Sequence, residues 1–93
     1  MIEIEDRASI DSDVLTLTDL VWGLLPDNLR LHVVEGAEVG EEVSAAIDAL
    51  DYLASSGIVV PDGVRVVAER ILSQISFEPD VLRLKWVLLN LKK

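Results

Sequence analysis

The sequence predicts a mainly α-helical fold, a small bundle of about four helices built as a single domain over residues 1–93. Apolar side chains recur at the spacing of one helix face in four segments, which are residues 13–25, 41–56, 61–76 and 79–92. Hydrophobic residues make up 51% of a chain that is too short for two separate cores. We therefore expect these helices to share one core.

The first predicted helix covers residues 13–25. Its apolar face consists of Val14, Leu17, Val21 and Leu24. Asp13 is a candidate N-cap, because a short acidic side chain can accept a hydrogen bond from a free backbone N–H of the first turn. Pro26 ends the segment, because proline cannot continue a helix. Trp22, in the same segment, is expected in the core.

Two short segments, residues 2–5 and 29–34, alternate between apolar and polar residues. A period of two is typical of a half-buried strand, so the sequence predicts a minor two-stranded β element in which these segments pair. The alternative for residues 29–34 is a short helix that Pro26 and Asp27 open and Gly36 ends.

The helix predicted over residues 41–56 has the most regular apolar face. That face consists of Val43, Ala46, Ile47, Leu50, Leu53 and Ala54. Glu41 and Glu42 lie in the first turn, where the helix dipole favours negative charge. Gly57 follows at the C′ position, where glycine commonly ends a helix.

Residues 61–76 carry the next predicted helix, with Pro61 at its first position. An alternative is a β-hairpin in which residues 58–60 turn at residues 61–63 into residues 64–67. The apolar stripe runs on to Ile75, which favours the helix because a short strand would end sooner.

The last predicted helix covers residues 79–92. Eight of the eleven residues 81–91 are apolar, so apolar side chains point in every direction around this helix. Such a helix needs burial on more than one side. We expect either burial inside the domain or a homodimer formed through residues 81–91, in which Trp86 is an interface anchor.

The charge is strongly acidic and unevenly distributed. The chain has 17 Asp and Glu against 8 Lys and Arg, a net charge of -9, and 13 of the acids precede residue 58. This charge repels phosphate backbones and anionic membrane surfaces, so neither nucleic acid nor a membrane is an expected partner. The chain lacks cysteine, an apolar run of membrane-spanning length and a signal-peptide start, so we expect a cytoplasmic protein.

Catalytic and cofactor motifs are weak in this sequence. His32 is the single histidine, and its neighbour Glu35 belongs to a scattered acidic loop, which is a poor zinc site. The glycines are isolated, so they form no phosphate-binding loop. We therefore expect no enzyme activity, no cofactor and no bound metal.

The leading hypothesis is a small acidic protein-binding module that engages a basic protein partner through its anionic N-terminal face. An inhibitor or immunity-type protein would use this layout, because acidic side chains steer fast association with a cationic partner. The candidate partner-binding residues are Glu38, Glu41, Glu42, Asp48, Asp51, Tyr52 and Trp86.

Two alternatives belong to other classes. Residues 50–62, which read LDYLASSGIVVPD, resemble the end of helix two and the Ile-x-Ile-Pro-Asp loop of acyl carrier proteins, which implies an acidic four-helix carrier domain. The modified serine of that family would fall near residues 41–43, where this chain has Glu-Glu-Val. The second alternative is a winged-helix-like protein-interaction or regulatory domain, with residues 41–56 as its recognition helix and residues 58–67 as its wing.

Overall fold

The computed structural model describes residues 2–92, and the side chains of residues 11–92. The described chain forms five helices and one short 3-10 turn: α1 (Ile2–Val21), η1 (Trp22–Leu24), α2 (Asp27–Glu38), α3 (Glu42–Ser55), α4 (Val64–Gln74) and α5 (Glu78–Asn90). The predicted helical bundle is confirmed, and it has one helix more than the sequence indicated.

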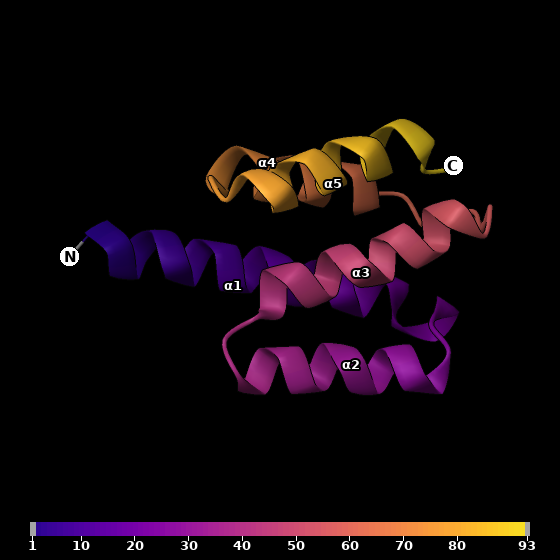
Figure 1. Cartoon of the computed structure of the whole chain (residues 1–93), viewed down its shortest axis with the longest axis horizontal. Helices are drawn as coiled ribbons and strands as arrows, with labels where there is room; N and C mark the ends of the chain where they lie inside the picture. The colour runs from indigo at the N-terminus through magenta and orange to yellow at the C-terminus, as the bar shows by residue number, and fades with distance from the viewer. Residues whose placement is uncertain (1, 93) are drawn as a thin grey trace.

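α3 is the centre of the bundle. In Figure 1, α4 and α5 lie on one side of α1 and α3, and α2 lies on the other side. α3 packs against α1, α2 and α5, while α4 packs against α1 and α5. The largest fully buried side chains come from four of the five helices: Leu17, Val21, Ile47, Leu50, Leu53, Val64, Ile71, Leu84 and Val87.

The predicted β element is wrong. Residues 2–5 lie in α1 and residues 29–34 lie in α2, and the only pairing among residues 2–92 is one isolated bridge between Val59 and Lys92. The alternation in residues 29–34 is a short sample of a helical pattern, because positions 29, 33 and 36 face the rest of the protein together. α2 is the alternative helix opened by Pro26, but it runs through Gly36 to Glu38.

The helix ends follow local backbone chemistry. At Gly57 (φ 68°) the chain closes a Schellman motif, in which the N–H of Ile58 donates to the carbonyl of Leu53 at 3.0 Å. The same motif at Gly40 (φ 79°) ends α2. The predicted end of the 41–56 helix at Gly57 is therefore confirmed, whereas Gly36 does not end α2.

The predicted start of the helix over residues 61–76 is wrong by one turn. Pro61 precedes the helix, and Gly63, in a left-handed conformation (φ 93°), leads into α4 at Val64. The alternative hairpin does not form, because residues 64–67 are already helical. The winged-helix alternative loses its wing for the same reason.

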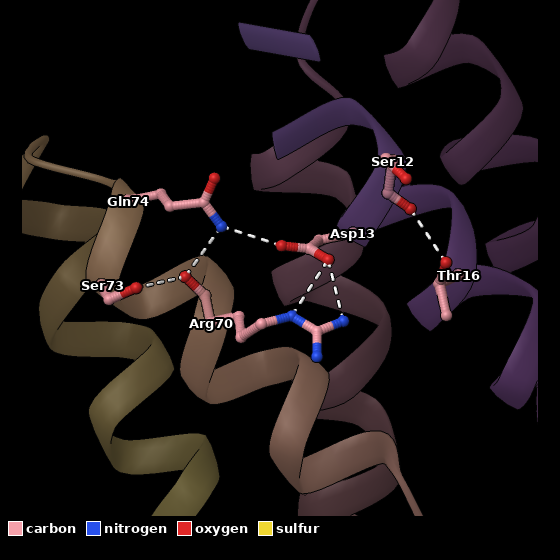
Figure 2. Close-up of polar contacts among 6 residues, drawn as sticks. All are labelled: Ser12, Asp13, Thr16, Arg70, Ser73 and Gln74. Carbon is pink, nitrogen blue, oxygen red and sulfur yellow. Dashed lines mark hydrogen bonds and ion pairs between the residues drawn. The ribbon is translucent and has the colours of Figure 1, made fainter. Parts of the chain in front are cut away.

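Asp13 joins α1 to α4 and is not an N-cap, because α1 begins at Ile2. Arg70 donates to Asp13 Oδ1 from Nε at 3.2 Å and from Nη2 at 3.0 Å, and Gln74 Nε2 donates to Oδ2 at 2.8 Å (Figure 2). These hydrogen bonds hold the pKa of the Asp13 carboxyl below its usual value. A carboxylate that is 9% exposed is thus fully partnered.

α5 is only partly buried. Leu84, Val87 and Leu88 pack into the core, but Leu82, Trp86 and Leu89 stay exposed on one face of the helix. The burial of α5 on several sides, expected from its composition, is therefore incomplete. No helix within residues 2–92 has the length and apolar character needed to cross a membrane.

Candidate functional site

A groove of about 950 Å³ lies between α1 and α2 on the described surface. Its lining is mostly apolar and has carboxylates among it: Asp11, Val14, Leu15, Thr18, Asp19, Trp22, Val33, Val34, Ala37, Glu38, Gly40 and Glu42. Grooves of this size that expose apolar side chains are typical of binding sites.

The groove exists because α2 packs closely against α3 and leaves one face of α1 uncovered. A Cβ atom built on Gly36 would lie 2.6 Å from the Cβ of Ala45, so only glycine permits this approach of α2 to α3. α1 and α2 are not among the helix pairs that pack extensively in the described chain. The surface between them therefore stays open to solvent.

The wall of the groove formed by α1 and the first residue of η1 follows helical spacing, since its residues recur at intervals of three and four between Asp11 and Trp22. Val14 is buried at the bottom of the groove. Leu15 is 64% exposed and Trp22 is 37% exposed, although both are large and apolar. α1 thus has two apolar faces, one in the core and one in the groove.

The α2 wall contributes Val33 at the bottom and Val34, which is 45% exposed, at the rim. Carboxylates surround these apolar residues: Asp11 and Asp19 from α1, Glu38 from α2 and Glu42 from the start of α3. Water can reach Asp11, Asp19 and Glu38, which are exposed side chains. The groove therefore combines an apolar floor with a negatively charged rim.

A basic residue lies at one end of the groove. The Arg30 guanidinium lies over the Trp22 ring, with Cζ 5.7 Å from the ring centroid, and Arg30 Nε donates to the Trp22 carbonyl at 3.0 Å. Arg30 also contacts Asp27 at 3.4 Å. This arrangement holds the Trp22 side chain, and it makes this end of the groove, where Asp19 is the lining carboxylate, less acidic than the other end.

Two of the predicted partner-binding residues, Glu38 and Glu42, line the groove. Asp48 and Asp51 do not line it, and both pair with Arg83 of α5, whose Nη2 lies 2.6 Å from Asp48 Oδ1 and 3.3 Å from Asp51 Oδ2. Hydrogen bonding to Asp48 holds the pKa of the Arg83 guanidinium above its usual value. These two carboxylates are partly neutralised and tie α3 to α5.

The remaining predicted residues lie outside the groove. Glu41 is exposed in the connection before α3, and Tyr52 and Trp86 are partly exposed on α3 and α5. The expected core position of Trp22 is wrong, because Trp22 lines the groove and is 37% exposed, and Trp86 is 46% exposed. The exposure of Trp86 agrees with an interface anchor, which stays a prediction.

The single histidine also has a structural partner. His32 Nε2 lies 2.7 Å from Asp48 Oδ2, which links α2 to α3. Among the described residues, no three side chains of the metal-binding types come together as a metal site.

Comparison of the chain with protein-family models, with curated proteins and with solved structures found no match.

Sequence reasoning missed the apolar groove residues Leu15, Trp22 and Val34, and Thr18 beside them. A signal was present, because Leu15, Thr18 and Trp22 recur at helical spacing and are flanked by Asp11 and Asp19. This second stripe was hidden by the stronger core stripe of the same helix.

Proposed function

We propose that the protein is a non-catalytic binding module that engages a basic protein partner through the groove between α1 and α2. The observation that carries the proposal is the joining of exposed apolar side chains and carboxylates in one concave site. Protein interfaces bury an apolar centre inside a polar rim, and this groove has that arrangement before any partner is bound.

The charge supports a cationic partner. Four carboxylates lie along the groove, and 13 of the chain's 17 acids precede residue 58. Complementary charge accelerates encounter and discriminates between partners, whereas the apolar contacts keep the complex together. This combination of steering charges and apolar contacts supports an inhibitor or immunity-type role, in which the module covers a basic surface of its target.

The test compares two variants of equal charge. The groove variant reverses Asp11, Asp19 and Glu38 to lysine. The control variant reverses three exposed carboxylates that do not line the groove, Glu35, Asp62 and Glu69. Immobilised wild type and each variant are exposed to extract of the native host, and each retained protein is purified and titrated calorimetrically at low and high salt.

The proposal expects a basic protein that wild type and the control variant bind alike and that the groove variant binds at least about tenfold more weakly. The affinity of this partner for the wild type should fall as the salt concentration rises, because salt screens the attraction between the partner and the carboxylates of the rim. Equal loss of affinity in both variants would show that overall charge, and not the groove, holds the partner, and would refute the proposal.

A further inference from the structure

The length of the groove limits what can fill it. Its α1 wall runs from Asp11 to Trp22, which at 1.5 Å per helical residue is about 16 Å. A helix of about three turns has this length. The apolar residues Leu15, Trp22 and Val34 stand along it as separate contact points, which suits an occupant with apolar side chains at i, i+4 and i+7.

The walls favour a helix over an extended peptide. α1 and α2 use their backbone N–H and C=O groups within each helix, so the groove offers side chains and no backbone edge to an occupant. An extended peptide would bury unpaired backbone groups against these walls, whereas a helix satisfies its own. Helices also pack into the space between two others at ordinary interaxial distances of about 8–10 Å.

The rim gives the groove a direction. Asp11, Glu38 and Glu42 line the groove at the end of the α2–α3 connection, whereas the opposite end has one lining carboxylate, Asp19, and Arg30, whose charge Asp27 offsets. The N-terminus of a helix is the positive end of its dipole and the C-terminus is the negative end. A bound helix is therefore most stable with its N-terminus at the more acidic end.

From this geometry we infer that the groove holds a single amphipathic helix of about three turns, with Lys or Arg on both flanks, and that this helix lies parallel to α1. The inference rests on the proposed function and names the partner's binding element. It adds the secondary structure of that element and its orientation, neither of which the charge of the protein alone determines.

The first experiment uses a synthetic peptide of about 14 residues, with leucines at i, i+4 and i+7 and lysines spaced evenly along both flanks. The control peptide has the same composition but distributes its leucines around the helix. Binding is followed by Trp22 fluorescence in a Trp86→Phe background, and peptide helicity by circular dichroism. The amphipathic peptide should become helical on binding and bind at least about tenfold more tightly than the control.

A matched pair of protein variants locates the peptide. Leu15 is 64% exposed in the groove and Val66 is 55% exposed on α4, so a glutamate at either position replaces an exposed apolar side chain and adds one negative charge. Leu15→Glu should weaken peptide binding at least about tenfold, and Val66→Glu should leave it unchanged. Equal effects of the two substitutions would overturn the placement.

The orientation is tested with a nitroxide on either end of the amphipathic peptide. An N-terminal nitroxide should broaden the Gly40 amide signal and spare the Trp22 indole N–H, and a C-terminal nitroxide should do the reverse. Equal broadening at both ends, or the opposite pattern, would refute the parallel orientation.

The outcomes separate this inference from the proposed function. If both peptides bound the wild type equally and neither bound the groove charge variant, the groove would still be an acidic site for a basic partner. The inference of a helical occupant would then be wrong. Self-association of the wild type that Leu15→Glu abolishes would assign the groove to a second copy and overturn it as well. If the groove retained a basic host protein but neither peptide bound, the inference of a helical occupant would be wrong, and the proposed function would stand.

Discussion

Gly36 controls the distance between α2 and α3, and replacing it with alanine tests how the groove is built. The new Cβ would lie 2.6 Å from the Ala45 Cβ and 3.2 Å from the Glu41 carbonyl oxygen. Neither neighbour is the end of a flexible side chain, so α2 must move. Overpacking of this kind costs up to about 3 kcal/mol, while alanine gains about 1 kcal/mol of helix propensity over glycine.

The expected net effect of Gly36→Ala is therefore a loss of about 1–2 kcal/mol in the free energy of unfolding. For a domain of this size that loss lowers Tm by at least about 4 °C. Urea unfolding and thermal melts, followed by circular dichroism, measure both quantities. Gly23→Ala is the control, because nothing lies within 4 Å of a Cβ at that position and its backbone is not left-handed. It should be neutral or slightly stabilising.

A second substitution identifies the cause. Ala45→Gly removes the methyl group that the new Cβ would strike, so the Gly36→Ala/Ala45→Gly pair should recover stability relative to the sum of the single effects. Strict additivity of the two substitutions, or a Gly36→Ala protein at least as stable as the wild type, would refute the claim that close packing requires glycine here.

Three further predictions concern the core, the ion pair between Asp13 and Arg70, and α5. Leu53→Ala should cost about 2–5 kcal/mol in urea unfolding, because Leu53 is fully buried in α3, and a smaller loss would indicate collapse of the cavity. Asp13→Asn should cost about 1–2 kcal/mol at pH 7, because the carboxylate accepts charged hydrogen bonds from Arg70. The pKa of Asp13 is lowered in the folded state, so the stabilisation by its carboxylate is complete above the ordinary pKa of 3.8 and disappears as the pH falls through the folded-state pKa. The free energies of unfolding of the wild type and of Asp13→Asn should therefore differ at pH 7 and converge at low pH. Residues 81–91 should form a homodimer through the exposed face of α5, which lies in the nearly neutral C-terminal part of the chain, and Trp86→Glu should abolish the dimer in light scattering; a wild type that is monomeric at high concentration would contradict this.

The elements that local chemistry decides were predictable from the sequence. α3 has a continuous apolar face and a glycine at its C′ position, and both signals lie within the segment itself. The prediction of the β element was wrong because its two segments are too short for their local pattern to decide the secondary structure. Four to six alternating residues fit a strand or a helix equally well, and only burial of Leu29, Val33 and Gly36 on a common side of α2 decides between them.

Interactions between distant residues were not predictable. Asp13 has the chemistry of an N-cap, but its partner Arg70 lies 57 positions away, and nothing in the local sequence connects them. Asp48 and Asp51 likewise appear as free acids on a helix face, whereas Arg83 pairs with both. Glu38 and Glu42, two of the predicted partner-binding residues, line the groove, and their role in binding stays a prediction.

The groove itself depends on one contact that the composition conceals. Because Gly36 lets α2 approach α3, α2 does not cover α1, and Leu15 and Trp22 stay exposed. Burying one large apolar side chain stabilises a protein by about 1.5–3 kcal/mol, so this arrangement forgoes stability that a covered α1 would have. The carboxylates around the groove offset a second cost, because they repel other copies of an acidic chain that would otherwise adhere to exposed apolar surface. Under the proposed function, the same charges would also favour a cationic helix, so that the acidic rim and the exposed apolar side chains would act together in one site.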